Sequence, residues 1–203
     1  MKHLFYTVGN EPEWNVLPYG NTDKNILIDD IKYHLRNEYQ SRWLSVINKS
    51  EGRNKTEGNK LRTYSKFKKE FQIEKYLLST QSKRNRAEYA KLRISAHKLA
   101  IEMGRYHRPN KIPADSRFCI FCKDGSIEHE EHFILKCKLY SQERNECFNK
   151  LKDILEGFQN FNDLQIFKII MSADNDIEIT KIVVKFVAQC MEKRSNQMGS
   201  GQI

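Results

Sequence analysis

The sequence predicts a mostly α-helical fold that is interrupted by one small irregular element. Hydrophobic residues recur at steps of three and four in several segments, which is the spacing of one face of an α-helix. Glycine and proline residues lie between these segments, where they mark turns and helix ends. The stretch around Cys119 and Cys122 shows no helical period, so we expect it to be irregular.

The first 59 residues divide into two predicted parts. Residues 1–24 have no clear period and contain two prolines, so we expect an irregular N-terminal extension. In residues 25–59 a continuous apolar stripe predicts an amphipathic helix, and the polar residues that follow it predict a loop. The stripe consists of Ile28, Ile31, Leu35, Tyr39, Trp43 and Ile47.

The rest of the chain divides into a basic helical domain, residues 60–157, and a C-terminal part, residues 158–203. Helical patterns in the first of these cover residues 60–71, 74–79, 84–100, 130–136 and 139–155. Gly104 and Gly157 are expected to end helices. In the C-terminal part we expect helices over residues 164–171 and 177–193, followed by a short polar tail.

The chain is basic, and its excess of positive charge is concentrated in one part. It has 203 residues and a formal net charge of +9. Between Lys49 and Lys111 there are 18 Lys and Arg residues against six Asp and Glu residues. This favours a polyanion as partner, although a solvated helical surface would give the same count.

The composition predicts an intracellular protein of the nucleus or cytoplasm. No apolar run approaches the roughly 20 residues of a membrane span, so we expect no membrane association. The N-terminal residues 1–6 are too short and too polar to be a signal peptide.

Four residues in the centre of the chain have the spacing of a metal site. His132 and Cys137 follow the pair Cys119 and Cys122 within 15 residues. Two thiols at this spacing, followed by an imidazole and a third thiol, are typical of tetrahedral Zn²⁺ sites. A redox role would require a βαβ context, which the surrounding sequence does not show. The sequence therefore predicts a zinc-binding knuckle with Zn²⁺ held by Cys119, Cys122, His132 and Cys137.

His129 is a second histidine near these cysteines, and helical geometry argues against it as a ligand. If residues 130–136 are helical, the rise of about 1.5 Å per residue separates His129 from Cys137 by roughly 12 Å along the axis. His132 and Cys137 are separated by at most about 7.5 Å, and they can converge if the helix ends near Lys136. The alternative is that these cysteines are ordinary buried residues.

The neighbouring carboxylates, Glu128, Glu130 and Glu131, allow two interpretations. They could perform acid–base chemistry, but we favour N-terminal helix carboxylates that the helix dipole stabilises. A zinc ion with four protein ligands has no open position for water or substrate, so we expect no enzymatic activity. A metal hydrolase would need an open position, and a cysteine enzyme would need a low-pKa thiol with a histidine partner. Cys147 and Cys190 lie on apolar stripes and are expected in the core.

Arginine residues alternate with aromatic residues in the basic block, which suits nucleic-acid binding. Arginine makes bidentate contacts with phosphate, and aromatic rings stack on bases. Sequence-specific readout is not expected, since no helix-turn-helix or C₂H₂ pattern is present. The alternative is that Tyr89 and Tyr106 belong to the core. The predicted phosphate contacts are Arg84, Arg86, Arg93, Arg105 and Arg108.

Three groups of residues between Leu61 and Tyr140 form a familiar pattern. They are Leu61-Arg-Thr-Tyr64, the run from Lys91 to Pro109, and Cys119-x-x-Cys122 followed by Glu131-His132-Phe-Ile-x-x-Cys137-x-x-Tyr140. This pattern resembles the C-terminal zinc-binding region of non-LTR (LINE-type) retrotransposon reverse transcriptase polyproteins. The resemblance covers roughly residues 28–194. One departure is Lys138, where relatives often have proline.

The resemblance implies zinc on the matching cysteines and His132, and contact with RNA or target DNA. It implies no polymerase activity, because the catalytic aspartates of reverse transcriptases have no counterpart and Asp29-Asp30 lies in a helical pattern. We therefore expect a non-catalytic zinc-binding, nucleic-acid-binding module derived from the region after the reverse transcriptase domain. The alternative is an interaction scaffold whose apolar stripe packs on a polymerase domain or on a second copy.

Overall fold

The computed structural model describes residues 24–48, 60–68, 70–79, 82–172 and 176–199. The chain forms two compact units, Met1–Lys49 and Ser50–Ile203. In the described segments the regular structure is helical, and one isolated antiparallel bridge joins Phe118 to Ile127. The mostly helical fold is therefore confirmed. The predictions for residues 1–23, for the loop after residue 48 and for the last four residues lie outside the described residues.

The first unit contains α3, Lys24–Ile47. The predicted helix is present, but its apolar surface is less one-sided than the stripe suggested. At about 100° per residue, Ile26, Tyr33 and Leu44 lie on the side of the helix opposite Ile28. Ile26 and Tyr33 are 65% and 62% exposed. The described part of this unit is thus a single helix with apolar residues on two sides.

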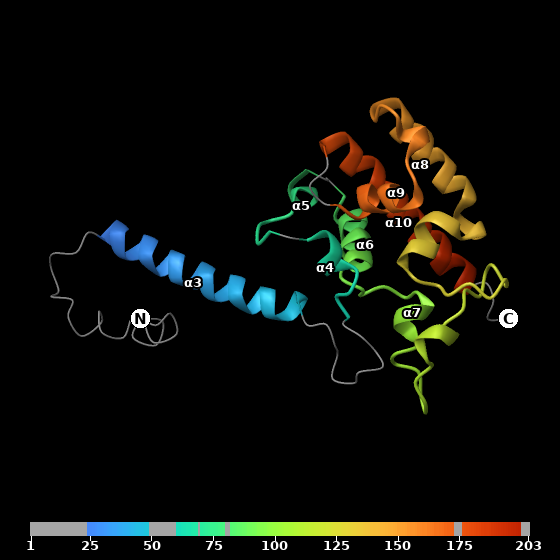
Figure 1. The fold of residues 1–203 in the computed structure, drawn as a ribbon, viewed down its shortest axis with the longest axis horizontal. Helices are drawn as coiled ribbons and strands as arrows, with labels where there is room; N and C mark the ends of the chain where they lie inside the picture. The colour runs from blue at the N-terminus through green and yellow to red at the C-terminus, as the bar shows by residue number, and fades with distance from the viewer. Residues whose placement is uncertain (1–23, 49–59, 69, 80–81, 173–175, 200–203) are drawn as a thin grey trace. The chain divides into compact units, whose positions relative to one another are not determined.

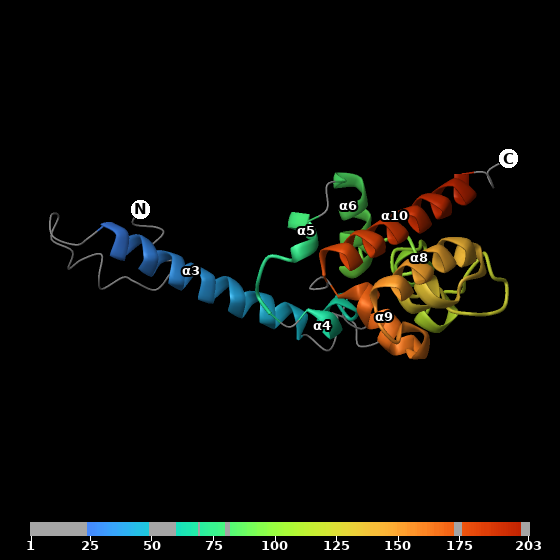
Figure 2. The same cartoon turned by 90° about the horizontal axis from the view of Figure 1, so that it is seen from above.

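The second unit is a cluster of helices around one core (Figures 1 and 2). Helix α10 packs against α5, α6 and α8, and it buries Val183, Val184 and Val187 there. Helix α10 lies in the same compact unit as the helices before residue 157. The helices are α4 Tyr64–Phe67, α5 Lys75–Ser79, α6 Lys83–Arg93, α7 Ala100–Met103, α8 Ser141–Ile154, α9 Asp163–Met171 and α10 Ile177–Gly199.

Helix termini in this unit follow local side-chain chemistry. Asn162 and Gln165 form a reciprocal capping box at the start of α9, which satisfies backbone N–H groups that the helix leaves unpaired. The Ser82 hydroxyl accepts a hydrogen bond from the Asn85 backbone at the start of α6. Gly157 follows α8 with φ of +74°, a conformation that glycine adopts at no steric cost.

Two predicted helices are shorter than their patterns. The pattern over residues 60–71 gives only α4, which ends where Lys68 adopts an extended backbone. The Lys68 side chain is buried, and its Nζ atom donates to the Gln72 carbonyl at 2.8 Å. The pattern over residues 84–100 ends at Arg93, because Ser95 adopts φ of +54°. This turn directs Ser95 and His97 toward Glu130. At the second site a partner distant in sequence thus outweighs helical propensity.

Among the described residues, no helix has both the length and the apolar character needed to cross a membrane.

Candidate metal centre

Cys119 and Cys122 lie in a short irregular loop that is closed by backbone hydrogen bonds. The Cys119 N–H donates to the Ser126 carbonyl at 2.8 Å, and the Glu128 N–H donates to the Arg117 carbonyl at 2.9 Å. Gly125, with φ of +77°, makes the tight turn between them. The predicted turn at Asp124-Gly125 is therefore present, and it lets the chain return to pair with the segment that carries Cys119.

His132 and Cys137 stand at the two ends of one helical turn. The structure forms a π-helix over His132–Lys136 in place of the expected α-helical segment. The Cys137 N–H donates to the His132 carbonyl at 2.8 Å, which closes this wider turn. The helix does end at Lys136, as convergence of the two ligands requires.

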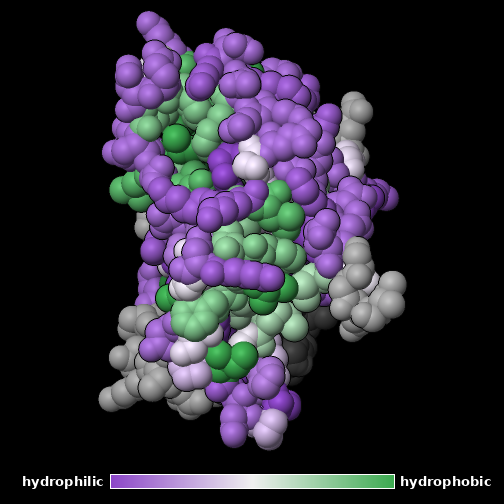
Figure 3. All heavy atoms as spheres, turned by 90° about the vertical axis from the view of Figure 1, so that its right-hand side faces the viewer, coloured by the Kyte–Doolittle hydropathy of each residue, from purple (hydrophilic) through white to green (hydrophobic). Residues whose placement is uncertain are grey.

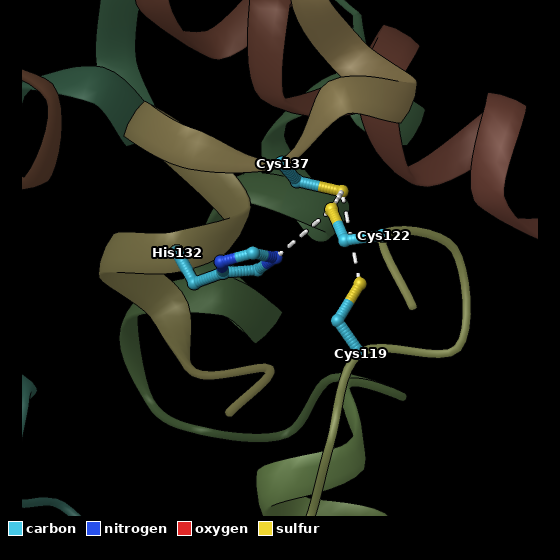
Figure 4. Close-up of side chains that lie close together, drawn as sticks. All are labelled: Cys119, Cys122, His132 and Cys137. Carbon is cyan, nitrogen blue, oxygen red and sulfur yellow. Dashed lines mark hydrogen bonds between the residues drawn. The ribbon is translucent and has the colours of Figure 1, made fainter. Parts of the chain in front are cut away.

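The structure brings all four predicted ligands together (Figure 4). The Cys119 and Cys137 sulfurs lie 3.8 Å apart, and those of Cys122 and Cys137 lie 3.6 Å apart. The His132 Nε2 atom lies 3.5 Å from the Cys122 Sγ atom. A Zn–S bond of 2.3 Å sets the edge of a sulfur tetrahedron at about 3.8 Å. The donor atoms, all within 4.8 Å of one another, are thus spaced for one metal ion.

Burial shapes the acid–base behaviour of these donors. It raises the pKa values of the Cys119 and Cys137 thiols and lowers the pKa of His132. Each shift favours the uncharged form. A neutral imidazole is the form that binds metal, whereas the thiols must lose protons to do so. A divalent cation would supply the positive charge that keeps these buried sulfurs ionised.

Backbone and arginine donors support the cluster from outside. The Lys138 N–H donates to the Cys122 sulfur at 3.4 Å. The Arg144 guanidinium, from α8, donates to the Ile134 and Cys137 carbonyls, both at 2.7 Å. Arg144 therefore fixes the turn that presents Cys137. This role of Arg144 has no signal in the sequence, because only its place on α8 brings it to the turn.

Other candidate ligands lie outside the cluster. The His129 Nδ1 atom accepts a hydrogen bond from the His132 backbone at 3.2 Å, so it supports the turn without joining the four donors. Cys147 and Cys190 are buried in the helical core, as expected.

The glutamates near the knuckle differ from the prediction. Glu128 is 1% exposed, and both its oxygens accept from the Arg194 guanidinium of α10, at 2.6 and 3.0 Å. Glu130 is 3% exposed. Burial would raise the pKa of Glu130, but the hydrogen bond from His97 and the charge of Arg62 hold it at about 2. These two carboxylates are therefore internal ion-pair partners, a role that their interpretation as helix N-terminal carboxylates does not include.

Two of the predicted phosphate contacts, Arg93 and Arg105, are wrong because both side chains are buried. Arg93 is 2% exposed, forms an ion pair with Glu74 and donates to the Met171 carbonyl at 2.9 Å. Its guanidinium also lies 5.5 to 5.6 Å from three tyrosine ring centres, those of Tyr64, Tyr76 and Tyr89. Arg105 is 9% exposed and lies 3.1 Å from the Glu102 carboxylate. Both cations stabilise the interior, where they cannot reach a phosphate.

The other three predicted phosphate contacts are not buried: Arg84 and Arg108 are exposed, and Arg86 is half-buried. Arg84 pairs with Glu192 at 3.0 Å in an exposed position, and Arg86 donates to the Leu77 carbonyl. Arg108 is exposed in the segment after α7. The two tyrosines of the basic block differ in burial, because Tyr89 is buried whereas Tyr106 is 58% exposed. The core interpretation thus holds for Tyr89 and not for Tyr106.

No protein-family model, curated protein or solved structure matches this chain. The fold and the centre together define a mostly helical protein with a Cys₃His cluster that could hold a metal ion. The resemblance to retrotransposon polyproteins rests on the sequence motifs and stays a prediction.

Proposed function

We propose that this protein is a non-catalytic, zinc-stabilised module that binds RNA or DNA. The single observation that carries the proposal is the tetrahedral spacing of three thiols and one imidazole. This donor set and geometry favour zinc. Protein ligands fill all four positions, which supports a structural role for the metal. The motifs support descent from the region after the reverse transcriptase domain of a non-LTR retrotransposon.

Zinc would join two segments that backbone hydrogen bonds and the side chains of Arg144 and Arg194 hold separately. The loop of Cys119 and Cys122 contains an isolated bridge rather than a strand pair, and His132 and Cys137 frame a single π-helical turn. Metal-binding free energy in such sites contributes directly to folding. The ion would thereby fix the knuckle on the helical core.

A cationic surface loop beside the knuckle supports nucleic-acid binding. Residues 105–111 project between α7 and the knuckle, and the Ile112 N–H donates to the Gly104 carbonyl at 3.0 Å to close the loop. His107, Arg108 and Lys111 are exposed on it. With a net charge of +9, such a surface attracts a polyanion. Arg84 and Arg86 remain as further candidate contacts on α6.

The salt dependence of binding tests the nucleic-acid part. We expect binding of fluorescein-labelled single-stranded RNA, measured by anisotropy, to weaken linearly on a log–log scale with salt. Arg108→Ala should reduce the slope by about 0.7, the value for one phosphate contact on a single strand. Lys152→Ala, which removes an exposed cation on α8, is the matched control. Absence of binding to RNA and DNA at low salt would contradict the proposal.

A second candidate function is a protein-interaction scaffold. The apolar side chains on two sides of α3 favour it, since Ile26, Tyr33 and Tyr39 are each more than half exposed. A reverse transcriptase domain or a second copy could cover them. Light scattering after size-exclusion chromatography tests self-association, with Tyr39→Glu as the disrupting variant. If the protein is a monomer at all concentrations, self-association is excluded, and the partner of α3 would have to be a different protein.

A further inference from the structure

An apolar hollow lies directly beside the cationic loop. It has a volume of about 410 Å³, within the usual range of about 300–1,000 Å³ for ligand pockets. Figure 3 shows a group of hydrophobic side chains bordered by hydrophilic ones in the lower half of this face. Four large apolar side chains line the hollow with 49% to 58% of each exposed: Met103, Tyr106, Phe118 and Ile120. Such a contiguous patch marks an interaction site.

The metal centre and the hollow share one stretch of chain. Cys119 directs its sulfur to the metal cluster, while its neighbours Phe118 and Ile120 line the hollow. Alternate residues of an extended segment point to opposite sides. Arg117 holds the far end, donating to the Ile112 carbonyl at 2.8 Å and to the Ile101 carbonyl at 2.6 Å. The knuckle thus positions the apolar walls of the hollow.

The charges around the hollow favour an anionic ligand. No carboxylate lines it, and His107 contributes to its wall. Arg108 and Lys111 belong to the same exposed loop. Two carboxylates adjoin lining residues in sequence. Glu102 is buried and paired with Arg62 and Arg105, whereas Asp115 accepts a hydrogen bond from the Ser116 hydroxyl at 3.0 Å and lines a separate pocket with Arg62 and Lys66. A ligand that fits would combine a flat apolar group with an adjacent negative charge.

We infer that this hollow binds an unpaired base of single-stranded nucleic acid, while the loop of residues 105–111 contacts the flanking phosphates. Every base has a π-face that can stack on Tyr106 or Phe118 without sequence preference. In a duplex the bases are stacked on one another and cannot enter. The inference rests on the proposed function and specifies its substrate as single-stranded.

The test compares three labelled probes on the full chain in one buffer. They are an oligouridylate of about 16 nucleotides, the length of a large single-strand site, an abasic strand of equal charge, and an RNA duplex of equal length. Wild type should bind the oligouridylate most tightly. Tyr106→Ala should weaken that binding by about 5- to 150-fold, the range for one stacked base, and leave abasic binding unchanged. Tyr106→Phe, which keeps an aromatic ring, should bind the oligouridylate as tightly as wild type does.

Leu164→Ala, at a 72% exposed apolar position on α9, is the control and should bind as wild type does. Equal affinity of wild type for all three probes, with Tyr106→Ala unaffected, would overturn the inference and leave nucleic-acid binding intact. Failure to bind any probe would overturn the proposed function as well. Self-association that Phe118→Ala abolishes, without any preference for the base-containing strand, would assign the hollow to a second copy instead.

Discussion

Cys137 is the most enclosed of the four donors, with no exposed side-chain surface. Its sulfur lies within 3.8 Å of both other sulfurs, and its backbone closes the π-helical turn. A thiolate at this position would therefore contact the metal from within the core. Such a ligand is hard to replace, because neither water nor a neighbouring side chain can take its place.

We expect Cys137→Ser to lose bound metal. Structural zinc binding is worth about 10–16 kcal/mol in zinc-finger peptides, so an equal share per ligand is about 2.5–4 kcal/mol. Metal content per chain and competition with a chelator measure the loss. Cys147→Ser, at a buried cysteine outside the cluster, should keep its metal. Equal metal content in the two variants would argue against Cys137 as a ligand.

The buried pair of Glu128 and Arg194 gives a second prediction at this scale. Glu128→Ala leaves a guanidinium buried without its carboxylate, which costs about 3–5 kcal/mol. The double variant Glu128→Leu with Arg194→Met should recover part of that loss, because no charge is then left unpaired. Denaturant unfolding of the single and double variants measures both effects.

The exposed pair of Lys181 and Glu178, on the surface of α10, serves as the comparison. Glu178→Ala should change the free energy of unfolding by less than about 1 kcal/mol, as exposed pairs do. If Glu128→Ala were equally mild, the buried pair would not hold α10 to the knuckle.

Between α7 and the knuckle, Gly104 is required by packing rather than by backbone conformation. A Cβ atom there would lie 2.5 to 2.8 Å from three side-chain atoms of Arg117. The backbone at this residue is right-handed helical, with φ of −62°. The predicted helix over residues 84–100 does not reach Gly104, which instead follows the short helix α7. Glycine is needed there because the arginine that holds the loop approaches closely.

Gly104→Ala should therefore destabilise the second unit by about 1–3 kcal/mol through overpacking. It should also displace Arg117 from the Ile101 and Ile112 carbonyls and loosen the loop of residues 105–111. Thermal unfolding and amide exchange of the loop measure the two effects. Gly199→Ala, where a Cβ atom meets nothing within 4 Å, should leave both unchanged. An unaltered loop in Gly104→Ala would show that Arg117 can move aside.

At the scale of the whole molecule, the core lies within the second unit. Its buried hydrophobic cluster runs from Tyr76 to Met191, and the chain divides at Lys49 and Ser50. We expect a fragment of residues 50–203 to fold and to keep its metal. Its melting temperature should lie within about 4 °C of that of the full chain, the shift for about 1 kcal/mol at this size. An unfolded fragment would show that the first unit is needed for the core.

The metal donors could be predicted from sequence because they are chemically distinctive and close along the chain. The helices α8, α9 and α10 could be predicted because each buries one periodic face. The buried arginines could not, since Arg93 contacts Glu74 and Met171, and Arg105 contacts Glu102, which also pairs with Arg62. The sequence alone does not distinguish a basic residue that is exposed to water from one that pairs with a buried carboxylate. A count of basic residues therefore overestimates the positive charge on the surface of the basic block, because some of these residues are buried.

The end of α6 and the π-helical turn could not be predicted from the sequence, for a related reason. Both depend on contacts formed only after folding, in one case with Glu130 and in the other with Arg144. A local pattern can indicate a helix, but it does not contain the partner that ends or widens it.

Metal analysis of the purified full chain, followed by unfolding with and without a strong chelator, shows whether zinc holds the knuckle in place. We expect one zinc ion per chain and a large fall in melting temperature when the ion is removed, with recovery on adding zinc. A folded, metal-free protein whose unfolding is the same with and without chelator would contradict it.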